Sequence, residues 1–173
     1  MTTRAVFEPR AIVSTLARHE VRFVAIGGWA ASVQDAGWPT LDVDIVVATD
    51  AHNMPLLRAA LEELRAEYDT PHRPPIRPDL SRLTTLAGPQ LFRTKHGRLD
   101  VLKEAGGETY ESLITDAVEV EQNERVVRCA SLAALVRMKR AANRPKDLCW
   151  LLHSSSAGLL RKPRRVARWE RSS

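Results

Sequence analysis

The sequence predicts one α/β (α+β) domain in which helices flank a mixed, twisted sheet, followed by a helical C-terminal part. Short apolar runs of strand length alternate with amphipathic segments of helical length, and glycines and prolines separate them. The length of 173 residues suffices to bury one core. We expect a core at 1–130, C-terminal helices that complete the active site at 131–152, and a basic tail at 153–173.

Helices and strands alternate in the N-terminal half. An apolar run ends at Gly27-Gly28, which suits a buried strand followed by a sharp turn. Gly37 is well placed to stop the helix that follows, and Asp50 or Asn53 can cap a later one. The expected elements are, in order, a helix over 8–19, a strand over 21–26, a helix over 29–36, a strand over 41–47 and a helix over about 55–67.

The second half begins with a loop over 69–80, which contains four prolines. Ser131 can cap a helix that runs to about Ala142. Pro145 then begins a further helix, which carries Asp147 to Leu152. The remaining expected elements are short strands at 82–86, 91–94 and 98–102, a helix near 108–115, and a strand pair at 117–121 and 125–129.

The composition is that of an ordinary soluble globular protein, with 44% apolar and 27% charged residues. No apolar run approaches the roughly 18 residues of a membrane span, and the first ten residues lack a signal-peptide core. We therefore expect a cytoplasmic protein with no membrane partner. Cys129 and Cys149 lie far apart without metal-ligand spacing, so we expect two buried thiols.

The net charge of +5 and the pI of about 9.7 point to an anionic partner. The excess is uneven, because residues 161–171 hold six basic residues and one acid. Such a tail can neutralise the phosphates of a nucleic acid. For the tail alone, a solvated segment without a partner is the alternative.

Asp42 and Asp44 are the first candidate for chemistry. Because side chains alternate along a strand, both carboxylates share one face of the 41–47 strand, with α-carbons roughly 6.5–7 Å apart. They can therefore converge on one divalent ion, which would remove their mutual repulsion. Two solvated acids on an edge strand are the alternative, and the pair alone would favour it.

Two features beside the pair strengthen the metal interpretation. Gly27 and Gly28 let backbone amides approach a phosphate, and the start of a helix there favours negative charge, although such a turn alone is weak evidence. Asp100, in the strand over 98–102, alternates onto the face opposite its apolar neighbours and can complete a three-carboxylate cage. We expect Mg²⁺ in this cage, with Mn²⁺ as a substitute.

Lys139 lies on the apolar side of the helix over 131–142. On a helical projection Leu132, Leu135 and Val136 fall at about 0°, 300° and 40°, and Lys139 falls near 340°. A lysine there extends outward to solvent or meets an anion such as a triphosphate. The basic neighbours of Lys139 include Arg137 and Lys146, candidates for nucleotide binding, while Asp147 can pair with one of these bases or help order the site.

Two motifs resemble known proteins. The segments Gly27-Gly28-Trp29-Ala30 and Thr40-Leu41-Asp42-Val43-Asp44-Ile45-Val46-Val47 resemble the DNA polymerase β-like nucleotidyltransferase superfamily. The later segment from Met138 to Leu148 resembles the lysine and Arg-Pro-Lys-Asp segment of AbiEii and MenT-type toxins. The resemblance covers residues 21 to about 152 and implies a minimal nucleotidyltransferase fold.

The resemblance also implies roles for single residues. Asp42 and Asp44 would bind the magnesium that orients a nucleoside triphosphate, and Asp100 matches the third acid of the superfamily. Lys139 would contact the nucleotide phosphates. Thr40 matches the serine or threonine of the toxin motif, which a partner phosphorylates in related toxins.

The function implied by the resemblance is that of a toxin in a toxin–antitoxin system. Such a toxin transfers a nucleotide, here expected to come from CTP, to the 3′ end of tRNA and so blocks aminoacylation and translation, and a cognate antitoxin restrains it. One position departs from the pattern, because Trp150 stands where family members often carry a second acid. Residues 151–173 also lack the expected regular helix, which leaves the role of Asp147 open.

Two alternatives remain on the sequence alone. The same chemistry can act on another acceptor, such as an antibiotic hydroxyl or a protein tyrosine. A different class is a non-catalytic antitoxin or RNA-binding module on a degenerate scaffold, which would have no need for Asp42, Asp44 and Asp100 together. Magnesium-dependent nucleotide binding separates the enzyme from this second class.

Overall fold

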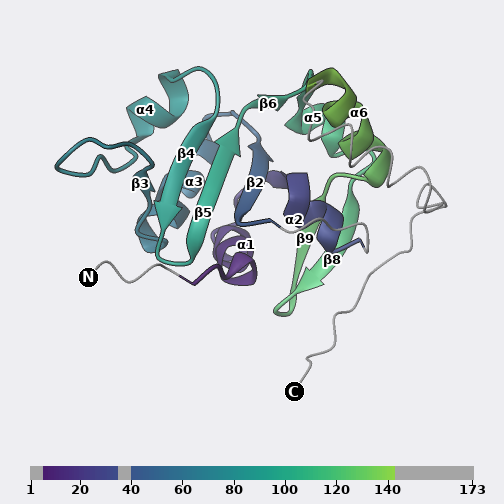
Figure 1. The fold of residues 1–173 in the computed structure, drawn as a ribbon, viewed down its shortest axis with the longest axis horizontal. Coiled ribbons are helices and arrows are strands. Elements are labelled where there is room, and N and C mark those ends of the chain that lie inside the picture. Colours follow the sequence, from purple (N-terminus) through teal and green to yellow (C-terminus); the bar gives the residue numbers. More distant parts are fainter. Residues whose placement is uncertain (1–5, 35–39, 143–173) are drawn as a thin grey trace.

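The computed structural model describes residues 6–34 and 40–142. A seven-stranded sheet of order β3-β4-β5-β2-β1-β9-β8 forms its centre, beside a small sheet of β6 and β7. The large sheet is mixed: β2 pairs with β5 and β1 with β9 in parallel, and its other pairings are antiparallel. Helices flank it (Figure 1), so the expected α/β architecture with a mixed sheet is confirmed.

The elements follow one another with short connections. The helices are α1 (Pro9–Arg18), α2 (Gly27–Ser32), α3 (Asn53–Glu63), α4 (Leu80–Thr85), α5 (Tyr110–Leu113) and α6 (Leu132–Ala142). The strands are β1 (Phe23–Ile26), β2 (Asp42–Val47), β3 (Glu67–Tyr68), β4 (Gln90–Thr94), β5 (Gly97–Leu102), β6 (Glu104–Ala105), β7 (Glu108–Thr109), β8 (Val118–Gln122) and β9 (Arg125–Cys129).

One predicted element has the wrong type. The segment 82–86, expected as a strand, lies largely within helix α4, and the Asp79 carboxylate caps it by accepting from the Arg82 N–H at 2.8 Å. The adjacent threonines suggested a strand, yet the Thr84 and Thr85 hydroxyls donate to carbonyls one turn back at 2.9 and 2.8 Å. A local cap and these hydroxyl bonds therefore outweigh β propensity here.

The other predicted elements in the described part of the chain agree with the structure to within a few residues, whereas the short pair of β6 and β7 was not predicted. Helix α3 ends earlier than predicted, and a short strand, β3, replaces its last part. The Ser131 hydroxyl accepts from the Ala134 N–H at 3.1 Å, as expected for the cap of α6. Gly37, the helix from Pro145 to Leu152 and the tail over 153–173 lie outside the described residues. The division at residues 130 and 131 stays a prediction.

The core lies mainly on one side of the sheet, and it extends to the other, where Val24 and Val46 are buried on the face that carries Asp42 and Asp44. Helices α1 and α3 lie behind the sheet in Figure 1, and their apolar side chains join one hydrophobic cluster with Val43, Ile45 and Val47 of β2. On the opposite face, no helix of the described part covers β4 and β5 in this view. The sheet therefore has one sealed face and one that is partly open, and the alternate residues of β2 point to the open one.

Two composition-based expectations can be compared with the described residues. None of the helices found there is long and apolar enough to cross a membrane. Cys129 is fully buried, as expected, and burial raises the pKa of its thiol to about 12. Cys149 lies outside the described part of the chain.

Asn53 joins three elements at the base of the sheet. Its side chain is fully buried, accepts from the Arg22 N–H at 2.7 Å, and donates to the carbonyls of Arg22 at 3.0 Å and Ala48 at 2.7 Å. The N-cap residue of α3 is His52, so neither expected residue is the cap; Asp50 Oδ1 accepts from the N–H groups of His52 and Asn53, and Asn53 is the first residue of the helix. Asn53 thus fixes the starts of β1 and α3 to the end of β2.

We predict that Asn53→Ala lowers the free energy of unfolding by about 3 kcal/mol, because it leaves buried backbone groups without partners. Denaturant unfolding monitored by circular dichroism measures this. Lys95→Ala, in the exposed β4–β5 turn, is the control and should change stability by less than about 0.5 kcal/mol. Equal effects of the two substitutions would contradict the role of Asn53.

Glu63 connects α3 to α1. Its carboxylate accepts from Arg18 Nη1 at 2.9 Å and contacts His19 Nε2 at 2.7 Å. These hydrogen bonds, that of Arg18 first, lower the pKa of Glu63 from 4.5 to about 2. A carboxyl with a lowered pKa in the folded state stabilises the fold above its unfolded pKa, and this contribution disappears as the pH falls through the folded pKa.

Glu63→Gln should therefore lower Tm at pH 7, and the difference from wild type should shrink as the pH falls from 4.5 to about 2. Thermal unfolding across this pH series measures the effect. The control is Glu62→Gln, whose pairing with Arg58 lies within one helix and is solvent exposed. A Tm difference for Glu63→Gln that grows on acidification would contradict the lowered pKa of Glu63 and its stabilising contacts with Arg18 and His19.

Candidate active site

Acidic and basic side chains form two rows across the open face of the sheet. The strand register places Asp42 beside Arg98 and Arg98 beside Arg93, while Asp44 lies beside Asp100 and Asp100 beside Leu91. Residues paired in this way point to the same side of the sheet. The three acids predicted from the sequence therefore share one face, with Asp44 and Asp100 directly opposite each other on β2 and β5.

The Gly27-Gly28 turn packs against the acids of β2. Gly27 follows Ile26, which pairs with Asp44, and has φ +68. A Cβ at Gly27 would lie 2.2 Å from Asp44 Oδ2, and one at Gly28 would lie 2.9 Å from the Cβ of Thr40. Only glycine fits this close approach and this backbone angle at position 27. The turn is thus a wall of the site on its β1 side.

Thr40 lies at the mouth of the site. Its hydroxyl donates to Asp42 Oδ1 at 2.7 Å. This bond holds the Asp42 carboxylate at the start of β2. Thr40 is half-buried, as is Asp42, so both side chains are reachable from the open face.

Asp100 is the most unusual acid of the three. Its Oδ1 is buried and has no hydrogen-bond partner. Burial, followed by the nearby charge of Asp42, raises the pKa of Asp100, and Arg98 acts in the opposite direction. A buried carboxylate oxygen without a partner is costly, so such a group commonly indicates a missing ligand or a catalytic role.

The three carboxylates do not close into a ligand cage by themselves. Within residues 6–34 and 40–142, no group of three or more His, Cys, Asp or Glu side chains is gathered closely enough to hold a metal ion. Like charges repel, and Asp42 turns to the Thr40 hydroxyl. The donor set still suits a hard cation, because all three groups are carboxylates on one face and Asp100 has an oxygen to spare.

The predicted phosphate-binding bases come from α6. Lys139 is half-buried on this helix, and α6 contacts α2, the helix that begins with the glycine turn. Arg137 instead points to other acids: it pairs with Glu108 at 2.8 Å and with Asp116 at 3.8 Å. Lys146 and Asp147 lie outside the described residues, so their assigned roles remain predictions.

Sequence reasoning missed a group of charges beside Asp100. Asp69, just after β3, pairs with Arg93 of β4 and with Arg98 of β5, the latter at 3.0 Å. Arg98 stands two residues before Asp100, so strand periodicity could have placed it on the same face. Arg93 and Asp69 could not be placed, because their proximity depends on the antiparallel pairing of β4 with β5 and of β3 with β4.

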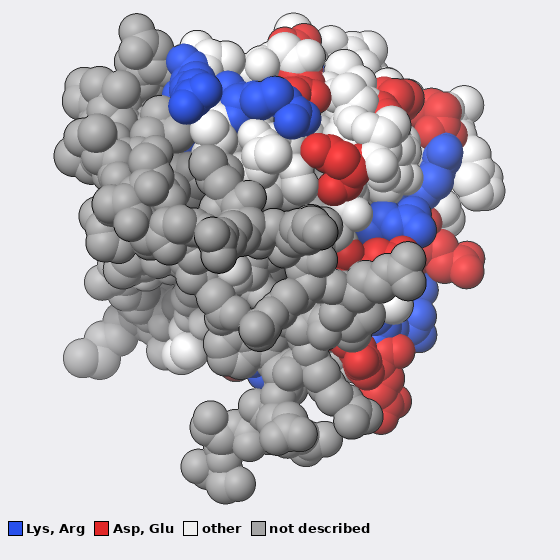
Figure 2. Space-filling model, turned by 90° about the vertical axis from the view of Figure 1, so that its right-hand side faces the viewer, with Lys and Arg blue, Asp and Glu red and all other residues white. Residues whose placement is uncertain are grey.

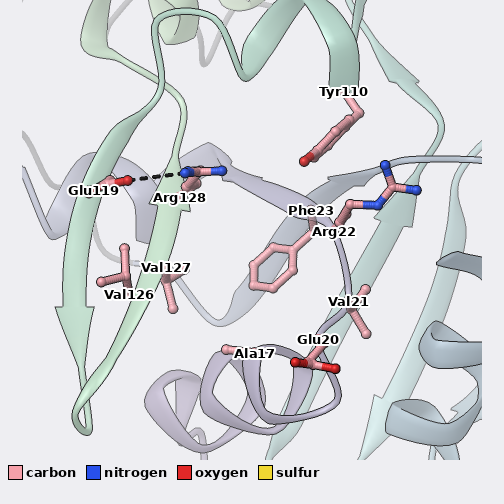
Figure 3. Close-up of a pocket in the computed structure, with 10 residues that line it drawn as sticks. All are labelled: Ala17, Glu20, Val21, Arg22, Phe23, Tyr110, Glu119, Val126, Val127 and Arg128. Carbon is pink, nitrogen blue, oxygen red and sulfur yellow. Dashed lines mark hydrogen bonds and ion pairs between the residues drawn. The ribbon is translucent and has the colours of Figure 1, made fainter.

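A pocket of about 290 Å³ lies elsewhere, at the opposite end of β1 from Gly27. Figure 3 shows Phe23 between α1 and the β8–β9 hairpin, with the ring of Tyr110 above it and the Glu119–Arg128 ion pair, 3.2 Å long, to one side. None of the residues predicted for chemistry lines this pocket. The candidate site is therefore the open sheet face.

Charge is nearly balanced in the described part of the chain. Of the 26 Lys and Arg residues 17 lie there, together with 18 of the 21 Asp and Glu residues. Figure 2 shows basic and acidic side chains interspersed on the described part of one face. The net charge of +5 therefore originates from residues outside the described part, chiefly those after 142.

No family model matches the chain, and no curated protein matches it. Solved structures do. LnuA, a lincosamide antibiotic adenylyltransferase with lincomycin bound, aligns with a TM-score of 0.56 and 16% identity over 88% of this chain and 99% of its own. ANT(2″)-Ia in complex with adenylyl-2″-tobramycin aligns with a TM-score of 0.52 and 19% identity over 85% and 86%.

A third structure, a proposed nucleotidyltransferase from Thermotoga maritima, aligns with a TM-score of 0.52 and 13% identity over 91% of this chain and 99% of its own. At such identities the likeness establishes the fold. The chain has the fold of these nucleotidyltransferases, as the glycine turn and the strand acids had suggested.

We predict that Gly27→Ala destabilises the protein by roughly 2–4 kcal/mol, because it combines backbone strain with a clash against the Asp44 carboxylate. Gly88→Ala is the matched control: Gly88 has φ +78, but nothing lies within 4 Å of a Cβ there. The control should show the backbone strain alone, about 1 kcal/mol. Chemical denaturation of both variants measures the difference, and equal losses would contradict the close approach of Gly27 to Asp44.

Proposed function

We propose that the protein is a magnesium-dependent nucleotidyltransferase that transfers a nucleoside monophosphate from a nucleoside triphosphate to a hydroxyl group. The observation that carries this proposal is the register of β2 and β5, which sets Asp42, Asp44 and Asp100 on one open face beside the Gly27-Gly28 turn. The fold shared with LnuA and ANT(2″)-Ia supports it.

The residues of the site divide into two tasks. Asp42, Asp44 and Asp100 would hold Mg²⁺, which when bound supplies positive charge that orients the triphosphate and stabilises the transition state. Backbone N–H groups of Gly27 and Gly28 and the Lys139 ammonium, on α6 beside α2, would contact the phosphates.

The reaction is a displacement at the α-phosphorus. The acceptor oxygen forms a bond to the α-phosphorus, and the bond from this phosphorus to the bridging oxygen of the β-phosphate breaks, so pyrophosphate leaves. The hydroxyl proton moves to the Asp100 carboxylate, whose buried Oδ1 has no other partner.

For the acceptor we propose the 3′ end of tRNA, with CTP as donor, in a toxin that blocks aminoacylation and is held in check by an antitoxin. The similarity of the Met138–Leu148 segment to AbiEii and MenT-type toxins supports this. The six basic residues over 161–171 would neutralise phosphates of the tRNA backbone. Phosphorylation of Thr40 would break its bond to Asp42 and place negative charge beside the acids, which offers a means of restraint.

An antibiotic hydroxyl is the second candidate acceptor, and the comparisons favour it specifically. LnuA is a lincosamide adenylyltransferase and ANT(2″)-Ia an antibiotic-resistance factor. The balanced charge of the described residues also suits a small acceptor. A protein hydroxyl and a non-catalytic RNA-binding or antitoxin role are further alternatives.

The test incubates the full chain with Mg²⁺ and each of four α-labelled nucleoside triphosphates, together with total tRNA, lincomycin or tobramycin. We expect label on tRNA, with CTP as the best donor, and loss of at least about 10³-fold in kcat for Asp42→Asn. Glu124→Gln, an exposed acid in the β8–β9 turn, is the control and should retain activity.

Label on an antibiotic and none on tRNA would show that the acceptor is an antibiotic rather than tRNA, and would still support nucleotidyl transfer. No transfer to any acceptor, or an Asp42→Asn variant as active as the wild type, would refute nucleotidyl transfer at this site.

A further inference from the structure

We propose that Arg98 and Arg93, oriented by Asp69, bind a phosphate of the acceptor next to its attacking hydroxyl. We call Arg93, Arg98 and Asp69 together the arginine clamp. The inference rests on the proposed function and narrows it, because it assigns the substrate class: an acceptor that carries a phosphate beside its hydroxyl, as the 3′ end of an RNA does.

Asp69 holds both arginines of the clamp in fixed positions. The Asp69 side chain is only 14% exposed and takes a different arginine on each oxygen: Arg93 on Oδ1, and Arg98 on Oδ2 at 3.0 Å. The Asp69 N–H also donates to the Leu91 carbonyl at 2.8 Å, which fixes its position beside β4. One nearly buried carboxylate therefore pairs with both guanidinium groups and limits how they can turn.

Both arginines keep donors for a ligand. The Arg98 side chain is 50% exposed and that of Arg93 is 62% exposed. A guanidinium has five N–H donors in a fixed plane, and Asp69 engages only some of those on each arginine. The free edges of two such groups match the oxygens of a phosphate better than any single lysine would.

Stability alone does not explain the clamp. Arg93 and Arg98 are directly opposite each other on β4 and β5, and like charges in such a pair are unfavourable. Asp69, whose side chain is 14% exposed, offsets one of these two positive charges. One positive charge of the pair is left over, and a bound anion would offset it.

The location of the clamp indicates which substrate it meets. Along the sheet the order is β4, β5, β2, β1, so the Gly27-Gly28 turn lies on one side of the β2 acids and the clamp lies on the other. In phosphoryl transfer the attacking and leaving oxygens are roughly in line through the phosphorus. If the leaving pyrophosphate lies towards the glycine turn, the acceptor arrives over β5 and β4.

The surroundings of Asp100 fit this direction. Arg98 precedes Asp100 by two residues on the same face, and Leu91, 38% exposed, lies directly opposite Asp100 on β4. A hydroxyl at Asp100 would thus have an arginine on one side and an apolar surface on the other. A ribose with its neighbouring phosphodiester and base presents these chemical groups.

The test measures transfer from CTP to an RNA oligonucleotide ending in CCA with a free 3′-hydroxyl. For Arg98→Ala we expect the KM for the RNA to rise by about 10- to 100-fold, with the KM for CTP unchanged. Arg98→Lys should recover only part of the loss, since it cannot bind in a bidentate manner. Asp69→Asn should also raise the KM for RNA, although both arginines are intact.

A binding measurement separates the clamp from the chemistry. In filter binding of the same RNA without nucleotide, Arg98→Ala should weaken binding and reduce the slope of log K against log salt by about 0.7. Arg128→Ala is the matched control, because Arg128 is also 50% exposed and pairs with a carboxylate across two strands, on β9, which β1 separates from β2. It should leave both measurements unchanged.

An unchanged KM and salt slope in Arg98→Ala would overturn the clamp, even if the variant is less stable. So would wild-type activity confined to lincomycin or tobramycin that Arg98→Ala does not alter. If transfer fails for every acceptor while the salt slope still depends on Arg98, the clamp holds and the proposed chemistry is refuted.

Discussion

The parallel pairing of β2 with β5 is the constraint on which the site depends. It aligns Asp44 with Asp100 and Asp42 with Arg98, so residues far apart in the chain meet on one face. A shift of one residue in this register would turn Asp100 towards the core and bring Leu99 or Val101 to the surface. Since Leu99 and Val101 are buried on the sealed face, the hydrophobic core itself holds the acids in place.

Electrostatic repulsion is the second determinant of the site. Burial and then the charge of Asp42 raise the pKa of Asp100, Arg98 lowers it, and the Thr40 hydroxyl donates to Asp42. Under the proposed function, a divalent cation held by the three carboxylates would offset their mutual repulsion. Under the proposed function, the guanidinium groups of Arg93 and Arg98 would offset the repulsion between these acids and a phosphate of the acceptor.

Local sequence patterns were sufficient for most of the fold and for the centre of the site. Alternation along β2 and β5 placed the acids, and the Gly27-Gly28 turn was evident as the end of an apolar run. Helix α4 was mistaken for a strand because its cap and hydroxyl bonds are stronger than the propensity of its threonines. The Asp69 group depends on strand pairing between distant segments, which no local pattern encodes, and the Arg137 pairs depend on how α6 packs near Glu108.

The central claim is that Asp42, Asp44 and Asp100 form one metal-dependent nucleotide site. Calorimetric titration of the full chain with a non-hydrolysable CTP analogue, with Mg²⁺ and then with EDTA, tests it most directly. We expect binding only with Mg²⁺, and its loss in Asp44→Asn and Asp100→Asn while Glu124→Gln binds as the wild type does. Binding that is independent of Mg²⁺, or that survives both substitutions, would contradict the claim.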